Sequence, residues 1–104
     1  MVSASTQFEL LVSDIRRRLL VLLLEADSVS VPGDLKRRTQ AFVDRSPSLE
    51  IELYHLHLPK LADEGVIEWD RTDDTVSRGA AFEEIEPLLR SLVANADELP
   101  FTVC

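Results

Sequence analysis

Residues 51–78 read IELYHLHLPKLADEGVIEWDRTDDTVSR, and the spacing of their apolar side chains changes once, at Gly65. Before that glycine, apolar residues recur at intervals of three and four, which is the spacing of one buried helix face. These residues are Ile51, Tyr54, Leu58 and Leu61. After it, residues 66–70 and 75–78 are rich in strand-forming side chains and enclose a polar turn at 71–74. The stretch therefore predicts a helix that ends at Gly65, followed by a β-hairpin.

The residues before this stretch predict two further helices and a short strand. Residues 6–12 form a lead-in helix, and Ser13 is suited to cap a longer helix over residues 14–26. Residues 29–31 are β-branched at both ends but too few for more than an edge strand. A second helix is expected over residues 33–44.

A last helix is expected between residues 80 and 99. Its apolar residues alternate steps of three and four, and they are Phe82, Ile85, Leu89, Leu92 and Ala96. Because proline is tolerated only in the first turn of a helix or at a kink, Pro87 allows two interpretations. Either the main helix begins near Glu86, or one helix from Ala80 bends at Pro87.

The order of these elements defines the expected fold. It is mainly α with a small β-hairpin, an α+β fold, and two steeply crossed helices followed by a hairpin form a winged helix-turn-helix. We expect a single domain over residues 1–104, with its winged-helix core at 8–78 and an extra C-terminal helix for dimerisation at 80–99. A chain of 104 residues is long enough for one modest core.

The charge balance is strongly acidic. Aspartate and glutamate contribute 19 residues against 11 lysines and arginines, for a net charge of −8. Such a surface serves either ordinary solubility or adaptation to high salt. In both cases non-specific binding to a polyanion is disfavoured, so any nucleic-acid contact must come from a local basic patch.

Cysteine content and hydropathy indicate the compartment. The single cysteine, Cys104, forms no disulfide within one chain, which fits a reducing environment. The longest apolar run, residues 19–24, is far shorter than a membrane span, and residues 1–5 lack the basic start of a signal peptide. We therefore expect a cytoplasmic protein without a membrane partner.

Two segments resemble a known family. Residues 51–71, IELYHLHLPKLADEGVIEWDR, resemble the recognition helix and wing of ArsR-like winged-helix proteins from halophilic archaea. Residues 8–27, FELLVSDIRRRLLVLLLEAD, resemble the first helix of the same group, including its Ser-Asp-x-Arg-Arg-Arg run. The resemblance implies a dimeric transcription regulator that binds double-stranded DNA. Its base-reading positions correspond to Ser48, Glu52, His55 and Leu56.

Basic side chains precede the third helix, which Ser46 and Pro47 are suited to begin. These basic residues are Lys36, Arg37, Arg38 and Arg45. They either contact DNA phosphates or form a solvated face that balances nearby acids. We take phosphate contact as the leading interpretation.

The third helix itself departs from the pattern of a base-reading helix. Its outer face carries two glutamates, which repel phosphate, and no arginine, asparagine or glutamine for a bidentate base contact. If Leu53 and Leu56 are exposed there, they could instead form a contact patch. The alternative function is therefore a winged-helix protein-interaction module that does not bind DNA.

The predicted hairpin has two candidate DNA contacts. Arg71 and Arg78 flank the turn residues 72–74, and an arginine at a wing often inserts toward the minor groove. The two aspartates in the turn equally suit a plain β-turn. Both interpretations remain open.

Other basic and metal-binding residue types carry no site. Residues 16–18, Arg-Arg-Arg, point in three directions on a helix, which favours structural pairing with acids such as Glu9 or Glu25. His55 and His57 are two apart and therefore diverge, and no zinc-type ligand set is present. We expect no metal, no cofactor and no enzymatic activity.

The terminal helices predict a homodimer. A winged helix is complete by residue 78, so the apolar stripe of the last helix is surplus to the minimal fold. It is expected to pair across a twofold axis together with Phe8 and Leu11. The alternative is that the stripe folds back over its own domain.

Overall fold

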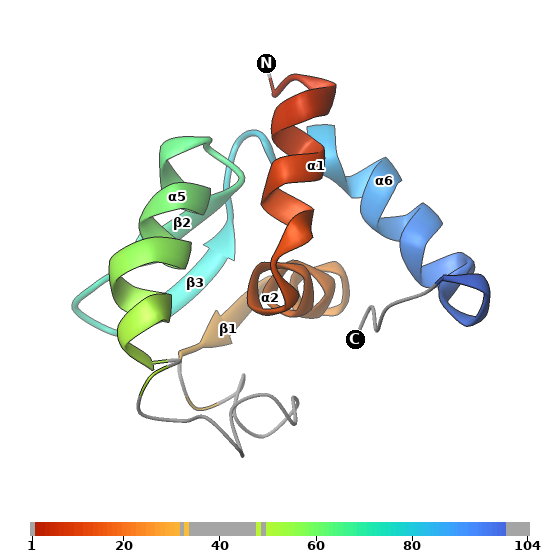
Figure 1. Ribbon diagram of the computed structural model, residues 1–104. Helices are drawn as coiled ribbons and strands as arrows, with labels where there is room; N and C mark the ends of the chain where they lie inside the picture. The colour runs from red at the N-terminus through yellow and green to blue at the C-terminus, as the bar shows by residue number, and fades with distance from the viewer. Residues whose placement is uncertain (1, 32, 34–47, 49, 100–104) are drawn as a thin grey trace.

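The structure is a computed structural model that describes residues 2–31, 33, 48 and 50–99 (Figure 1). Its helices and strands are, in order, α1 (Ala4–Val12), α2 (Asp14–Glu25), β1 (Ser28–Ser30), η1 (Leu53–His57), α5 (Leu58–Asp63), β2 (Ile67–Asp70), β3 (Thr75–Arg78), α6 (Phe82–Ala94) and η2 (Ala96–Glu98). Apart from residue 33, the predicted helix over 33–44 lies outside the described residues, and so do the basic residues Lys36, Arg37, Arg38 and Arg45 and the predicted capping residues Ser46 and Pro47.

Among the described residues, three strands form one antiparallel sheet in the order β1-β3-β2. β2 and β3 make the predicted hairpin, with Asp70 paired to Thr75 at its end. β1 lies along the other side of β3, where Val29 pairs with Val76. The predicted fold class, mainly helical with a small antiparallel sheet, is confirmed, and the predicted edge strand lies at the edge of the same sheet as the hairpin.

One serine forms the corner between α1 and α2. Ser13 is both the C-cap of α1 and the N-cap of α2. As N-cap, its hydroxyl accepts a hydrogen bond from the Arg16 N–H at 3.4 Å. The predicted start of the second of these helices is thus confirmed. Asp14 lies in the first turn, where a negative charge is favourable.

Two arginines of α2 reach back over this corner and cap the end of α1. The Arg16 guanidinium donates to the carbonyls of Glu9 and Leu10, both at 2.9 Å. Arg17 donates to the carbonyls of Leu11 and Val12, at 2.8 and 3.1 Å. A helix leaves its last four carbonyls without intrahelical partners, and these two side chains satisfy all four. Arg16 and Arg17 are therefore structural, as predicted, and their partners include backbone carbonyls as well as an acid, since Arg17 also pairs with Asp14 at 2.7 Å.

The third helix, residues 50–63, contains a π-helical turn that the sequence pattern did not predict. The Leu58 N–H donates to the Leu53 carbonyl, five residues back instead of four. Pro59 explains the wider turn, because proline lacks an N–H and its ring clashes with the carbonyl four residues before it.

This π turn rotates the start of the third helix about its axis. Leu53 is fully buried with Leu58 and Leu61, whereas Ile51 is 63% exposed. The prediction that Ile51 faces the core and Leu53 faces outward is wrong, because the intervals of three and four assumed an unbroken α-helix.

The C-terminal helix packs on its own chain. Phe82, Ile85 and Leu89 are at most 2% exposed and belong to the same core as α2 and the sheet. They cannot supply contact area to a second copy, so their assignment to a dimer interface is wrong; the apolar stripe folds back instead. Leu92 and Ala96 are half-buried against this core. α6 runs from Phe82 through Pro87 as one helix, which decides between the two interpretations of that proline.

Two glycines join the third helix, the hairpin and α6. Gly65 has a φ of 78°, the left-handed conformation predicted for a helix end. Gly79 lies so close to the Gly65 carbonyl oxygen that a Cβ at residue 79 would collide with it. Among the described residues, no helix has the length and apolar character that crossing a bilayer requires.

Candidate nucleic-acid interface

The predicted base-reading residues lie together on the outer side of the third helix. Ser48, His55 and Leu56 are exposed, and Glu52 is half-buried. Ile51 joins them because the π turn brings it to the surface. The resulting face combines apolar and acidic side chains with one exposed histidine.

An aromatic stack ties this helix to the hairpin. The rings of Tyr54 and Trp69 lie 5.8 Å apart with their planes inclined by 27°. The Arg71 guanidinium lies over the Trp69 ring, 4.3 Å from its centroid. Tyr54 belongs to η1, Trp69 belongs to β2, and Arg71 lies in the turn that follows β2. The stack therefore fixes the hairpin relative to the third helix.

Arg71 is the predicted wing contact that the structure leaves available. Its side chain is exposed, and none of the described residues forms an ion pair with it. An arginine stacked on a ring keeps its planar set of N–H donors directed outward. This geometry suits a ligand with paired oxygen atoms, such as a phosphate.

Arg78 is not available for such a contact. Its Nε donates to the Leu23 carbonyl at 2.6 Å, and an Nη donates to the Leu24 carbonyl at 3.2 Å. The guanidinium also lies over the Phe82 ring, 5.3 Å from its centroid. Its assignment as a DNA contact is wrong, because the carbonyls at the end of α2 already use its donors.

The hairpin turn is built by its aspartates. The Asp70 carboxylate accepts hydrogen bonds from the N–H groups of Thr72 and Asp73, at 3.0 and 3.3 Å. Asp74 has a φ of 52°, a conformation that aspartate tolerates better than most residues, and its carbonyl accepts from the Val31 N–H at 2.8 Å. Asp70 and Asp74 thus have structural roles that agree with a plain β-turn.

Behind the third helix lies a buried histidine that the sequence analysis did not select. His57 is 6% exposed, and its Nδ1 lies 3.1 Å from an Nη of Arg16, which is 7% exposed. Burial lowers the pKa of His57, the Arg16 charge lowers it further, and Glu52 opposes the shift. The imidazole is therefore held neutral, with Nδ1 as the acceptor. His55 is exposed, which confirms that the two histidines diverge.

Charged groups on α1 and α5 extend this cluster. Lys60 of α5 forms an ion pair with Glu9 of α1 at 2.5 Å. The hydrogen bond and charge of Lys60 lower the pKa of Glu9. Burial lowers the pKa of Arg16, against the influence of Glu9. Together these contacts attach the third helix to the corner between α1 and α2.

The sequence analysis missed Tyr54 and Trp69 as well as His57. Tyr54 was assigned to the core, but it is half-buried and its hydroxyl donates to the Val31 carbonyl at 3.3 Å. The usable signal was the lone tryptophan, placed two residues before an arginine at the end of a strand. Within the described part of the chain, no three histidine, cysteine or acidic side chains are grouped to hold a metal ion.

Comparison with known proteins relates the chain to a protein family. No curated protein and no solved structure matches the chain. A family model described as a domain of unknown function (DUF7344) matches residues 8–77, which include the second half of α1, all of α2, the third helix and most of the hairpin. Because this match covers well over half of the chain, the protein belongs to the DUF7344 family.

Proposed function

We propose that this chain is a transcription regulator that binds double-stranded DNA as a homodimer through a winged helix-turn-helix. The third helix would enter the major groove, and the hairpin would be the wing. The helical architecture with its small antiparallel sheet is compatible with this fold. The resemblance of residues 8–27 and 51–71 to ArsR-like proteins supports the same proposal.

The observation that supports it most is the stack of Tyr54, Trp69 and Arg71. It holds an exposed guanidinium on the hairpin, connected through Trp69 to Tyr54 of the third helix, and in the proposed complex this guanidinium would contact the DNA backbone. A pre-positioned arginine loses less side-chain freedom on binding a phosphate than a mobile one.

Further positive charge precedes the third helix in the sequence. Lys36, Arg37, Arg38 and Arg45 are proposed to contact phosphates. They would offset the repulsion that Glu52 exerts on the duplex. Ser48, His55 and Leu56 remain the proposed base-reading residues.

The test is a mobility-shift titration with duplex DNA from upstream of the chain's own gene. It is carried out at low salt and at about 1 M KCl, where the Debye length is about 3 Å. We expect Arg71→Ala to weaken binding about tenfold and to lower the slope of log K against log salt by about 1. Arg71→Lys should lose part of the affinity, because lysine keeps the charge but not the planar stack.

Arg90→Ala is the matched control. Arg90 is also exposed, but it lies on α6 and pairs with Glu86 at 2.7 Å, so its loss should leave the shift unchanged. The double variant Lys36→Ala with Arg37→Ala should weaken the shift as well. No shift for the wild type under either condition, or equal affinity of the Arg71 and Arg90 variants, would refute the proposal.

The alternative function, a protein-interaction module that does not bind DNA, is favoured by one observation. Ile51 is 63% and Leu56 is 50% exposed on the outer face of the third helix, beside Glu52. Leu53 was expected to form this patch with Leu56, but it is buried, and Ile51 takes its place. An apolar centre with acidic neighbours fits an amphipathic basic partner helix.

The two functions respond differently to Leu56→Arg. On a DNA-reading helix, added positive charge should strengthen non-specific DNA binding. If this face is instead a protein-interaction patch, Leu56→Arg should abolish partner binding, and the variant should show no DNA binding. The mobility shift of this variant therefore separates them.

A further inference from the structure

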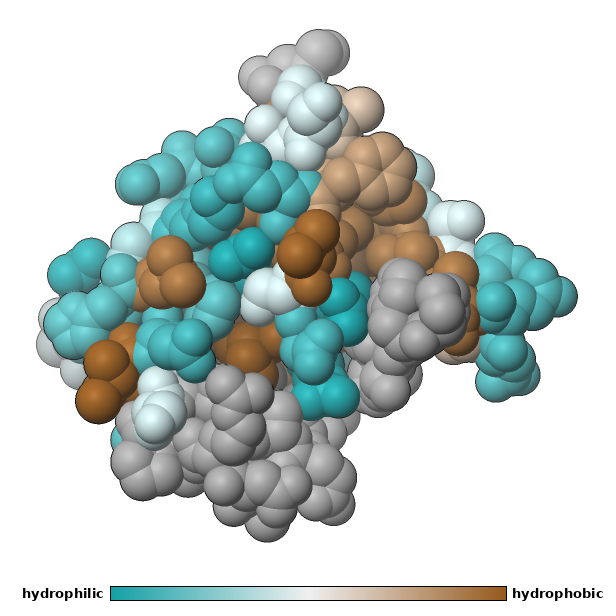
Figure 2. All heavy atoms as spheres, in the orientation of Figure 1, coloured by the Kyte–Doolittle hydropathy of each residue, from teal (hydrophilic) through white to brown (hydrophobic). Residues whose placement is uncertain are grey.

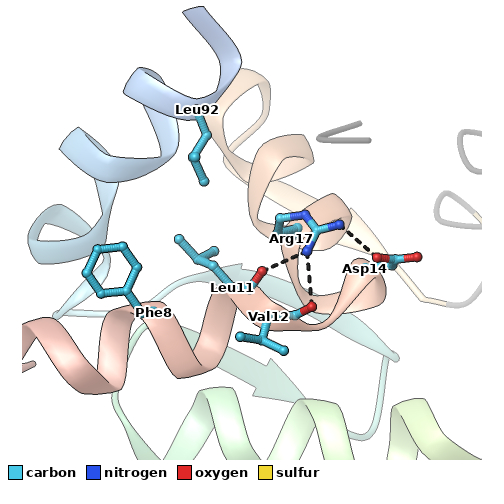
Figure 3. A pocket seen from close by; sticks show the side chains of 6 residues that line it. All are labelled: Phe8, Leu11, Val12, Asp14, Arg17 and Leu92. Atoms are coloured by element: carbon cyan, nitrogen blue, oxygen red, sulfur yellow. Dashed lines mark hydrogen bonds and ion pairs between the residues drawn. The ribbon is translucent and has the colours of Figure 1, made fainter. Parts of the chain in front are cut away.

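A hollow lies between α1 and α6 (Figure 3). Its volume is about 450 Å³, and it is lined by Phe8, Leu11, Val12, Asp14, Arg17 and Leu92. Leu92 of α6 faces the apolar side chains of α1, and the two charged residues come from α2, at the opposite end from Phe8 (Figure 3). This size and a mostly apolar lining with a few polar groups are typical of small-molecule sites. We call this surface the α1–α6 hollow.

The apolar part of the α1–α6 hollow has a buried floor and exposed walls. Leu11 is buried, whereas Phe8 is 60% and Val12 is 75% exposed, one turn apart on α1. Brown side chains gather over α1 and α6 in Figure 2. A molecule seated there would remove apolar surface from water, which is favourable in proportion to its area. If that molecule is aromatic, its contact with the Phe8 ring adds to the affinity.

The polar end of the hollow disfavours an anionic ligand. Arg17 is buried, and one of its Nη atoms donates to the carbonyls of Leu11 and Val12. The other Nη donates to Oδ1 of Asp14 at 2.7 Å. An anion would have to compete with these acceptors, and the net charge of −8 on the whole chain would repel it.

The same ion pair disfavours a cationic ligand and suits an uncharged donor. Arg17 neutralises Asp14, so a cation would lose its hydration without gaining an unshared counter-charge. The Asp14 side chain is exposed, and its Oδ2 can accept a further hydrogen bond while Oδ1 stays with Arg17. A hydroxyl group loses much less on leaving water than a charged group does, and it can donate to this oxygen.

We propose that the α1–α6 hollow binds an uncharged aromatic alcohol. Its ring lies against Phe8, Leu11 and Leu92, and its hydroxyl donates to the Asp14 carboxylate. This small-molecule site goes beyond the proposed DNA binding and does not rest on it.

A small molecule suits the hollow better than a second copy of the chain. Six residues line the hollow, whereas a specific protein interface engages roughly 20–30 residues on each side. Phe82, Ile85 and Leu89, which were expected to widen this face, lie in the core. A homodimer must therefore bury surface beyond the hollow, and a second copy is the competing occupant that an experiment has to distinguish.

The test is a heteronuclear NMR titration of the full chain, with Cys104 kept reduced and naphthylmethanol as the probe. We expect the largest changes in the amide signals of Leu11, Val12 and Leu92, with a dissociation constant below about 1 mM. Naphthoate and naphthylmethylammonium carry the same rings with a negative and a positive charge. Each should bind at least about tenfold more weakly, because its charge must leave water.

Substitutions locate the bound alcohol. Asp14→Ala removes the acceptor and should weaken binding of naphthylmethanol about tenfold. Asp63→Ala, at an exposed aspartate at the end of α5, is the matched control and should leave the affinity unchanged. Leu92→Trp should fill the hollow and abolish binding. If that variant fails to fold by circular dichroism, Phe8→Ala, at an exposed wall, should still weaken binding about tenfold.

Several outcomes would overturn the proposal. They are no signal changes up to the solubility limit of naphthylmethanol, changes centred on the third helix, and equal or tighter binding of either charged probe. Unchanged affinity in both Asp14→Ala and Phe8→Ala would overturn it as well. An affinity that falls as the chain concentration rises would show a second copy in the hollow and would also reject it. The mobility shift with DNA is measured without the alcohol, so the two proposals fail separately.

Discussion

At the scale of single residues, the pair of Arg16 and His57 shows how a buried polar contact depends on protonation. Arg16 is always positively charged, so the His57 Nδ1 can accept its hydrogen bond only as a neutral imidazole. Protonation would set two positive charges 3.1 Å apart, where neither is well solvated. The contact that attaches the third helix to α2 is therefore present only while His57 is neutral.

This predicts a pH dependence of the free energy of unfolding. The pKa of His57 is lowered in the folded state from its ordinary value of 6.5, so the unfolded chain binds more protons as the pH falls through 6.5. The contribution of His57 is complete above that pH. Below it, stability should fall by up to about 1.4 kcal/mol per pH unit. Urea unfolding at a series of pH values measures the slope.

The variant His57→Asn isolates this effect. The amide oxygen of asparagine can still accept from Arg16 but does not titrate, so the difference in slope between the two proteins belongs to His57. His55→Gln, at an exposed histidine outside the cluster, is the matched control for the loss of an imidazole. Equal slopes for the wild type and His57→Asn would contradict the prediction.

At the scale of elements, the third helix shows where periodicity misleads. An unbroken α-helix would place Ile51 inside, and Pro59 alone indicated that the helix was not regular. Proline predicts a missing hydrogen bond but not how the backbone adjusts to it. Here it adjusts by one wider turn, which exchanges the environments of Ile51 and Leu53.

The stability of two truncations measures this exchange. Leu53→Ala should cost about 2–5 kcal/mol, because it empties a fully buried position. Ile51→Ala should change stability by no more than about 0.5 kcal/mol, because its side chain is 63% exposed. Denaturant titration of both variants compares them directly. The reverse order of costs would mean that the third helix follows the regular register.

Signals from neighbouring residues predicted the other elements well. Ser13 and Gly65 marked helix ends because capping and left-handed backbone are decided by the residue itself. The hairpin followed from strand-forming residues on both sides of a polar turn. Arg78 and the stripe of α6 were misassigned because their partners, the end of α2 and the core, are distant in sequence.

At the scale of the whole molecule, the acidic excess opposes the compact state. With 19 acidic and 11 basic residues, folding brings like charges together on a small surface. The described ion pairs of Asp14, Glu9 and Glu86 neutralise only a part of this charge. We therefore expect the fold to be more stable where salt screens this charge.

We expect the unfolding temperature to rise as KCl is increased from low concentration to about 1 M, because the Debye length shortens from tens of ångströms to about 3 Å. Differential scanning calorimetry measures the change. Chloride is preferred to sulfate, which also strengthens apolar burial. An unfolding temperature that is unchanged or lower in KCl would show that self-repulsion is not important for this fold.

The arginine cap at the corner of α1 and α2 determines how the chain can be shortened. If the chain were made to start at Ser13, Arg16 and Arg17 would keep their places in the interior but lose the four carbonyls that bind them. Two buried cations would then need water, and the third helix would lose the ion pair between Lys60 and Glu9. The first helix is thus a permanent part of the domain, and affinity tags or fusion partners belong in front of it rather than in its place.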